Sequence, residues 1–311
     1  MHIDSLQYIQ FYPTLKCNSF CSFCFNRGIK HLEDISVNNF KSLLSIFSDI
    51  GIKELDILGG EPTLHPYFDK LIDLSYKNKL KVNISSNGSN INLLKSVSDK
   101  YNDNQIKIGI SLNSNPIRRE LHEYIIKYKP LLKTVSSNLQ LIPKAIKKYL
   151  YLPGIKFYLI FMDILYKDDL ENCLSFYDYF KEVNFLKNFY EHIYGVFCSG
   201  FIPDIESYPV LQYVRCPAGT TKLSVLPDGS VYPCYLFFRY EEFKLGNIFV
   251  DDFKKIWENP VLDFFRIFEK NNCVNTKCNL FSACHGGCPA ISFMIYGSLN
   301  SSDPRCVKQL S

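Results

Sequence analysis

The sequence lacks a stretch that could cross a membrane or direct export. Its longest uninterrupted apolar run covers only residues 157–162, whereas a membrane-spanning helix takes ~20 such residues. The first four residues contain neither a basic region nor a small-residue cleavage site, so no secretory signal peptide is expected. We therefore expect a soluble, cytoplasmic protein with no membrane partner.

The chain also lacks a strong excess of charge, internal repeats and low-complexity tracts. Its 35 Lys and Arg face 31 Asp and Glu, which leaves a net charge of +4 spread over 311 residues without a basic tail. This balance does not favour nucleic acid as a partner. Hydrophobic residues make up 47% and charged residues 21%, so a large core can form and wholesale disorder is excluded.

Cysteine, in contrast, is plentiful and clustered. Of the 12 cysteines, three lie within residues 17–24 and five within residues 273–306. A reducing compartment disfavours disulfides, and a chain of this length does not need them as staples. Bunched thiols in such a chain indicate metal ligands, for zinc or for iron–sulfur clusters.

Short apolar runs alternate with helix-like segments over the first two thirds of the chain. The predicted strands are residues 8–12, 52–58, 80–84, 106–112, 154–163 and 192–197. Four helices are predicted between these strands. The first begins after an N-cap at Ser36 and ends before Gly51, and the second follows Pro66. The third covers residues 93–101 and the fourth residues 168–180. This α/β alternation implies a parallel sheet with right-handed crossovers. About six such units would form an open or partial (β/α)6 barrel of the TIM-like kind, with its chemistry where the strands end.

The composition changes near residue 200, which predicts two domains, residues 1–205 and 206–311. In the second domain, residues 223–232 predict a hairpin around a Pro-Asp-Gly turn. A short helix around Trp257 follows, and beyond Pro260 the chain is loop-like and rich in cysteine. Such a segment has little apolar material of its own, so we expect bound metal to supply its fold.

The first cysteine group directly follows the first predicted strand. Cys17, Cys21 and Cys24 form a C-x3-C-x2-C set on one short loop. Structural zinc sites prefer four protein ligands, so three thiolates suit a [4Fe–4S] cube whose fourth iron is left open. A partial zinc site is the alternative. Phe23, beside the last cysteine, would shield one face of the cube.

This loop resembles the signature of the radical S-adenosylmethionine (radical SAM) enzymes, whose open iron is chelated by the amine and carboxylate of SAM. Gly59, Gly60 and Glu61 end the second predicted strand and resemble the family's Gly-Gly-Glu motif. The resemblance implies glycines that let the backbone approach the ligand, and a carboxylate that pairs with the SAM ammonium. Asn87 and Ser111, at the ends of the next two strands, are further implied SAM contacts.

The C-terminal third resembles the SPASM extension of radical SAM maturases, a seven-cysteine domain that usually holds two auxiliary [4Fe–4S] clusters. Its cysteines are Cys216, Cys234, Cys273, Cys278, Cys284, Cys288 and Cys306. The resemblance implies that the first two and Cys288 hold an inner cluster near the active site, and that the other four hold an outer one. Four residues separate Cys273 from Cys278, where the family has two, and this departure bears on whether both bind iron. A zinc ribbon is the alternative.

Other residues near these motifs have less specific roles. The inner cluster has three ligands in this allocation, so either Cys198 completes it or one iron stays open for substrate. Arg118 or Arg119 could reach the SAM carboxylate, although a solvated surface arginine is the commoner case. His65 and His285 are expected to be turn residues or hydrogen-bonded surface histidines rather than ligands.

The resemblance implies an enzyme, an oxidoreductase in which SAM is reductively cleaved and the resulting 5′-deoxyadenosyl radical takes hydrogen from a peptide or protein. We expect a crosslink in a ribosomally made peptide. Formylglycine formation is less favoured because Tyr235 follows Cys234, where the family's sulfatase maturases have Asp. The alternatives are a peptide epimerase with Cys198 or Cys173 as hydrogen donor, a carbohydrate dehydrogenase, and a non-catalytic iron–sulfur or zinc protein.

The same resemblance implies partners. A reductant such as flavodoxin or ferredoxin would supply electrons. Because Cys17 lies so close to the first residue, no leader-peptide recognition domain is expected before the barrel. Capture of a leader would then fall to a separate protein or to the mouth of the barrel.

Overall fold

A computed structural model of the chain describes residues 6–101, 104–113, 117–137, 142, 144–197, 216–267, 271–273, 277–279 and 281–307. Its strands are β1 (Tyr8–Phe11), β2 (Glu54–Ile57), β3 (Lys81–Ser86), β4 (Ile106–Ser111), β5 (Leu131–Ser136), β6 (Phe157–Phe161), β7 (Ile193–Val196), β8 (Lys222–Val225), β9 (Ser230–Tyr232) and β10 (Gly246–Asn247). Its α-helices are α1 (Val37–Asp49), α2 (Phe68–Lys77), α3 (Ile91–Lys100), α4 (Arg119–Tyr128), α5 (Phe176–Lys187), α6 (Phe253–Trp257), α7 (Val261–Arg266), α8 (Phe281–Cys284), α9 (Pro289–Tyr296) and α10 (Pro304–Val307). Its 3₁₀ helices are η2 (Pro62–Leu64), η3 (Lys144–Tyr151), η4 (Lys167–Asn172), η7 (Tyr235–Phe237) and η8 (Glu241–Phe243).

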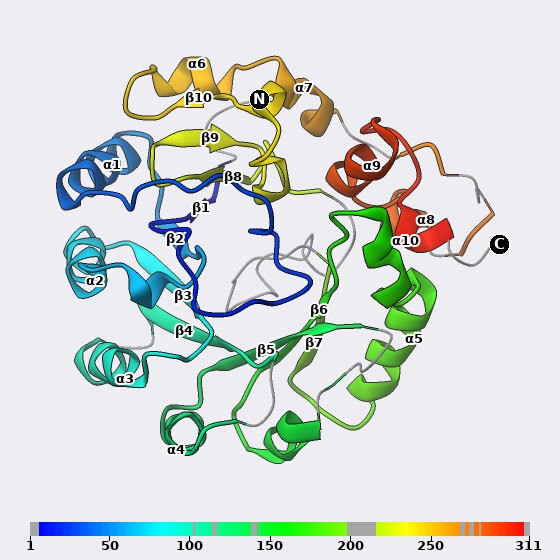
Figure 1. Ribbon diagram of the computed structural model, residues 1–311, viewed down its shortest axis with the longest axis horizontal. Coiled ribbons are helices and arrows are strands. Elements are labelled where there is room, and N and C mark those ends of the chain that lie inside the picture. Colours follow the sequence, from blue (N-terminus) through cyan, green and yellow to red (C-terminus); the bar gives the residue numbers. More distant parts are fainter. Residues whose placement is uncertain are drawn as a thin grey trace.

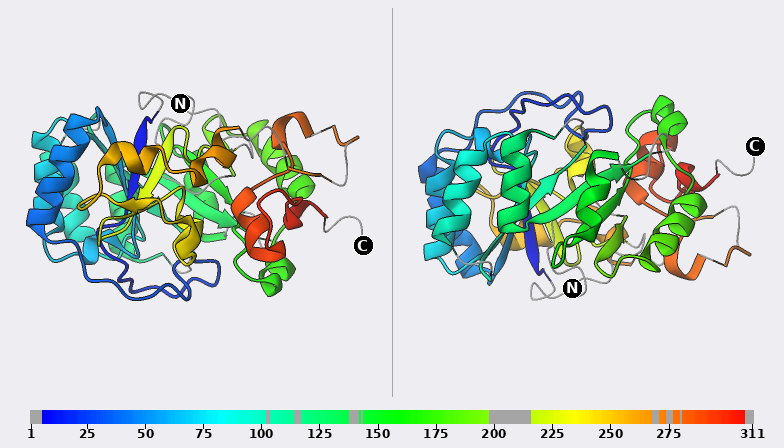
Figure 2. Two further views of the ribbon diagram at one scale, coloured as in Figure 1. Left: turned by 90° about the horizontal axis from the view of Figure 1, so that it is seen from above. Right: turned by 90° about the horizontal axis from the view of Figure 1, so that it is seen from below.

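The described strands form one curved ten-stranded sheet in the order β10-β9-β8-β1-β2-β3-β4-β5-β6-β7. All neighbours from β8 to β7 pair in parallel, and β9 and β10 join the β8 edge antiparallel. Helices α1 to α4 lie outside the curve (Figure 1). The α/β partial-barrel prediction is therefore confirmed. Because the strands are parallel, their carboxyl ends share one rim, along which the dark-blue segment after β1 runs (Figure 2).

Helix α1 forms where its local signals predict it. The Ser36 side chain accepts a hydrogen bond from the backbone N–H of Asn39 at 3.0 Å, which caps the first turn. Its apolar residues at helical spacing, among them Phe40 and Phe47, are buried against the sheet. Gly51 follows the helix with φ +79°, a left-handed conformation that glycine adopts without strain.

Strand β5 is absent from the sequence-based prediction. Lys133 and Thr134 interrupt its short apolar run and give it no strand-like alternation. Both side chains are nevertheless buried, because β5 lies in the middle of the sheet between β4 and β6. The interior of this barrel is thus partly polar. In the same interior, Asn83 donates a hydrogen bond to the buried carboxylate of Asp56 at 2.8 Å.

Two other segments also differ from the prediction. The helix expected over residues 168–180 is two elements, η4 and α5, because Cys173 is extended and Ser175 caps a new helix by accepting the N–H of Asp178 at 3.0 Å. The segment beyond Pro260, expected to be loop-like, contains α7, α8, α9 and α10. Helix α9 has a buried first half, so packing as well as metal can support this region.

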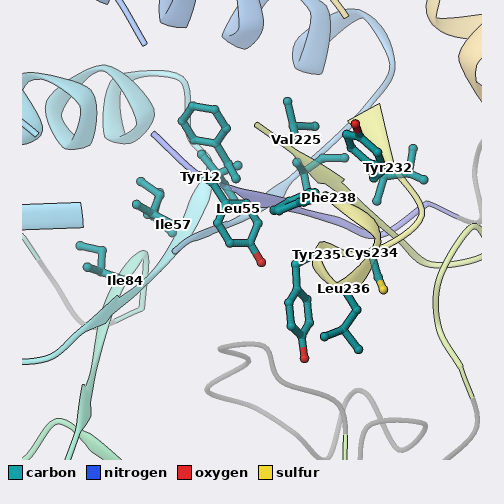
Figure 3. Packing of buried hydrophobic residues seen from close by; sticks show 14 of the residues in the cluster. Tyr12, Leu55, Ile57, Ile84, Val225, Tyr232, Cys234, Tyr235, Leu236 and Phe238 are labelled. Atoms are coloured by element: carbon teal, nitrogen blue, oxygen red, sulfur yellow. The ribbon is translucent and has the colours of Figure 1, made fainter. Parts of the chain in front are cut away.

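The C-terminal third is joined to the barrel by its own strand. The predicted hairpin over residues 223–232 is confirmed as β8 and β9, and β8 continues the sheet beside β1. Tyr12 packs edge-on against Phe238 with ring centroids 4.9 Å apart, and Tyr235 and Cys234 lie next to them (Figure 3). The proposed division between residues 205 and 206 falls outside the described residues and stays a prediction. Among the described helices, none is both long enough and apolar enough to cross a membrane.

Candidate active site

A cavity of about 720 Å³ lies at the carboxyl ends of the parallel strands. Its walls combine the first cysteine loop with residues within and directly after β2 to β6. Every residue that the SAM-binding prediction named lines it: Cys17, Cys21, Cys24, Phe23, Gly59, Gly60, Glu61, Asn87 and Ser111. The structure thus brings together side chains and backbone from four separate segments.

The two positions after β2 must be glycine because the backbone there lies directly against the segment that leads into the cysteine loop. A Cβ on Gly60 would lie 2.2 Å from the carbonyl oxygen of Lys16, and one on Gly59 would lie 2.5 Å from that of Thr14. Gly60 N–H donates to the Thr14 carbonyl at 3.0 Å, and Glu61 N–H donates to the Lys16 carbonyl at 2.7 Å. The glycines were expected to let the backbone approach the ligand, but in the structure their missing side chains make room for residues 14–16.

Glu61 is buried and tightly held by neighbouring donors. Its Oε1 accepts the hydroxyls of Thr63 at 2.6 Å and Ser86 at 2.8 Å, and its Oε2 accepts the Asn87 N–H at 2.6 Å. The Asn87 side chain in turn donates to Asn18 Oδ1 at 2.9 Å, within the cysteine loop. This network aims the carboxylate and links the end of β3 to the loop that carries the three thiols.

The three thiols of the loop have environments that suit a thiolate–iron bond better than a free thiolate. Burial raises the pKa of Cys17, Cys21 and Cys24, so the free side chains are neutral thiols. A bound metal deprotonates such thiols outright. The N–H of Asn26 points at Cys24 Sγ across 3.4 Å, a hydrogen bond of the kind that tunes iron–sulfur clusters. The donor set therefore fits a cluster at this site.

A second, small cavity of about 30 Å³ is lined by Cys216, Cys234 and Cys288. These thiols come from three separate parts of the C-terminal third. Tyr235 and Asp163 line both this cavity and the large one, and the Tyr235 hydroxyl donates a hydrogen bond to Asp163 Oδ2 at 2.5 Å. A carboxylate that follows β6 is thus held beside the residue after Cys234.

The remaining SPASM cysteines form another group. Cys306 acts electrostatically on Cys284, and both are influenced by Cys273. Cys278 acts on Cys306 as well, despite its longer spacing from Cys273. Burial raises the pKa of Cys284 to about 12 and that of Cys306 to about 11.

Within the described residues, no three His, Cys, Asp or Glu side chains converge as ligands of one metal ion. In a [4Fe–4S] cube each thiolate binds a different iron, which keeps the sulfurs apart. Three of the seven SPASM cysteines thus line one small cavity and the other four form a second group. Their assignment to an inner and an outer cluster stays a prediction.

The residues with less specific predicted roles fall into place as follows. Cys173 is fully buried and does not line the large cavity, and Cys198 lies outside the described residues. His65 is hydrogen-bonded as expected, to the Ile35 carbonyl at 2.9 Å, but it is buried rather than at the surface. His285 occupies a turn, with φ +53°.

The two arginines before α4 have different environments. Arg118 lines the large cavity and donates to the Gly88 carbonyl at 2.8 Å. Arg119 is exposed and pairs with Glu123 along α4 at 2.9 Å. Of the two, only Arg118 is placed to meet a ligand in the cavity.

One residue of the cavity had no sequence signal. Lys133 extends from β5 into the wall of the cavity and donates to the Ser85 hydroxyl. Desolvation lowers its pKa to about 8, while the negative charges of Asp56 and Glu61 oppose this effect. From sequence alone, a lysine outside any predicted strand is expected at the surface. Only the tertiary structure shows that Lys133 lines the cavity.

The comparisons with known proteins agree with this geometry. A family model of the radical SAM superfamily matches residues 11–187, more than half of the chain. The chain therefore belongs to the radical SAM superfamily. A second model, of the SPASM iron–sulfur cluster-binding domain, matches residues 216–289. The protein is accordingly an enzyme that uses iron–sulfur clusters and SAM.

Several named proteins are similar to most of this chain. The subtilosin biosynthesis protein AlbA of Bacillus subtilis is 26% identical over 88% of the chain, which spans 65% of that protein's length. The mycofactocin maturase MftC of Mycobacterium tuberculosis is 22% identical over 95% of this chain and 81% of its own. Streptococcus suis SuiB, solved bound to precursor peptide SuiA, superposes with a TM-score of 0.73 at 19% identity, over 97% of this chain and 76% of SuiB.

Proposed function

We propose that this radical SAM enzyme forms a crosslink within a ribosomally made peptide. The similarity to AlbA, named as a bacteriocin biosynthesis protein, and to the maturase MftC supports a peptide substrate. SuiB, of the same fold, was solved with a precursor peptide. A cavity of about 720 Å³ has room for a peptide segment beside SAM.

The common wall of the two cavities is the observation that carries the crosslink proposal. SAM on the first cluster supplies a carbon radical that takes hydrogen from an unactivated C–H bond. Closing a crosslink removes a second hydrogen, as an electron and a proton. Cys216, Cys234 and Cys288 would hold an electron acceptor directly behind Tyr235 and Asp163, and the Asp163 carboxylate can accept the proton.

Epimerisation has weaker support. It is redox-neutral and needs a hydrogen donor that faces the substrate. Cys173, one of the two candidate donors, is buried away from the cavity.

The proposal also gives the residues of the site their roles. We assign the SAM-binding cluster to Cys17, Cys21 and Cys24, with Phe23 against one face. The Glu61 carboxylate, held by Thr63, Ser86 and Asn87, would pair with the SAM ammonium. Gly59, Gly60, Asn87, Ser111 and Arg118 complete the SAM pocket.

The auxiliary clusters and the partners are further parts of the proposal. The inner cluster is assigned to Cys216, Cys234 and Cys288, with Cys198 or an open iron as its fourth position. The outer cluster is assigned to Cys273, Cys278, Cys284 and Cys306. We propose a cytoplasmic location, where thiols stay reduced and flavodoxin or ferredoxin can deliver electrons. A separate protein or the cavity mouth would bind the leader peptide.

The test has two stages. The anaerobically purified protein should contain about three [4Fe–4S] clusters and release 5′-deoxyadenosine from SAM when a reductant is added. A variant with Cys17, Cys21 and Cys24 changed to Ala should release no 5′-deoxyadenosine. Short peptides encoded beside the gene are then co-expressed with either protein and weighed. Loss of two hydrogens only with the intact enzyme supports crosslinking. Uptake of solvent deuterium without other mass change supports epimerisation, and zinc without SAM cleavage contradicts the whole proposal.

A further inference from the structure

Arg239 ties the turn after the first cysteine loop to the C-terminal third, beside the ring contacts of Phe25 with Tyr235 and Phe238. Arg239 follows η7, five residues after Cys234. Its guanidinium donates to the carbonyl of Phe25 at 2.9 Å and also to the carbonyl of Arg27. These carbonyls belong to the turn that directly follows Cys24, so Arg239 connects the segments of two different cysteine groups.

A second guanidinium lies beside the first. Arg27 donates to Asp169 Oδ2 at 2.6 Å. The ring of Tyr166 lies 5.2 Å from the Arg27 guanidinium carbon and 6.0 Å from that of Arg239, so it contacts both cations. A Cβ on Gly28 would lie 3.0 Å from the Tyr166 hydroxyl. The turn after Cys24 is therefore contacted by Arg239, Tyr166 and Asp169.

Both cations lie beside the last cysteine of the loop. The Arg239 guanidinium donates to the carbonyl of Phe25, the residue next to Cys24, and Arg27 lies three residues after Cys24 in the same turn. An arginine stays protonated at any pH that the protein survives. The same charges act on a cluster bound by Cys24, because reduction adds one negative charge and a nearby cation stabilises the reduced form.

We propose that Arg239 is a positioning residue for the SAM-binding cluster: it fixes the turn after Cys24 and raises the reduction potential of that cluster. A residue of the SPASM domain then sets how easily the first cluster accepts the electron that SAM cleavage needs. The inference depends on membership of the radical SAM superfamily and is independent of the peptide substrate.

The experiment is a redox titration of the reconstituted enzyme, followed by electron paramagnetic resonance. The signal that changes when SAM is added reports the SAM-binding cluster alone. In R239Q we expect the ratio of reduced to oxidised cluster at a fixed potential to fall about tenfold, a shift of 59 mV for one electron. R239K keeps the charge, so its shift should be less than half as large.

The matched control is R266Q. Arg266 also donates to two backbone carbonyls, but these belong to Gly219 and Trp257 of the C-terminal third and not to the turn after Cys24. We expect wild-type potential in R266Q. An unchanged potential in R239Q at full iron content, an equal shift in R239K, or an equal shift in R266Q would each overturn the proposal.

A second variant decides the matter if R239Q fails to assemble the cluster. D169N removes the negative partner of Arg27 and leaves both cations in place. The proposal expects the potential to move upward, opposite to R239Q. No change or a downward move would contradict an electrostatic role, since general loosening of the loop has no reason to reverse its sign.

Discussion

Lys133 offers a quantitative test of the polar barrel interior. Its side chain is 4% exposed and is influenced electrostatically by Asp56 and Glu61. Desolvation lowers its pKa from the ordinary 10.5 to about 8. At neutral pH, that difference in pKa lowers the free energy of unfolding by about 3 kcal/mol, because the charged lysine is less stable in the folded protein than in the unfolded chain.

The pH dependence has a definite sign. The unfolded chain binds the Lys133 proton more tightly than the folded chain does, so the free energy of unfolding rises between pH 8 and pH 10.5. The K133M variant lacks this group. Its stability advantage over the wild type at pH 7 should therefore shrink by about 2 kcal/mol at pH 9.5.

Thermal unfolding at the two pH values measures this change. For a chain of 311 residues, 2 kcal/mol corresponds to roughly 3 °C in Tm. The quantity of interest is the Tm difference between K133M and wild type, because other titrating groups cancel in it. K41M, at an exposed position of α1, is the control and should show no such change. A difference between K133M and wild type that stays constant from pH 7 to 9.5 would refute the reasoning.

Three further predictions concern packing around the cluster sites. G60A places a Cβ within 2.2 Å of the carbonyl oxygen of Lys16, next to the cysteine loop, so we expect most iron to be lost from that site. The control G51A, whose Cβ meets nothing within 4 Å, should keep its iron. Equal iron per chain in the two variants would contradict this account. C173A removes a buried thiol outside the cavity, so 5′-deoxyadenosine formation should stay within about twofold of wild type, and a tenfold loss would show that Cys173 participates. Arg305 pairs with the buried Asp303 carboxylate at 2.7 Å. R305M leaves this carboxylate without its cation, which costs about 3–5 kcal/mol and should lower Tm by roughly 5 °C. An unchanged Tm would show that the ion pair is dispensable.

Features that depend on short stretches of sequence were predictable. The C-x3-C-x2-C spacing places three thiols on one loop whatever the rest of the chain does. The Ser36 cap, the hairpin around Pro227 and the strand-end position of Glu61 follow from local propensities and are present in the structure. Local hydrogen bonds and side-chain periodicity decide such features, and both can be read from neighbouring residues.

Features that depend on distant partners were not predictable. The sequence of strand β5 looks polar because it contains Lys133. This side chain is buried only because β5 lies between β4 and β6. The contact between Tyr235 and Asp163 joins residues 72 apart in the chain. Neither residue type carries a local signal for such a contact, since its formation depends on how β6 and the C-terminal third pack.

The sequence by itself therefore determined the family, the cofactor class and the loop that carries the first three thiols, because these are properties of short contiguous motifs. Only the tertiary structure decided that a wall of Tyr235 and Asp163 separates two cysteine-lined cavities, and that Arg239 reaches the turn after Cys24. The physical reason is that such contacts arise from the pairing of β8 with β1, which brings the C-terminal third against the first cysteine loop.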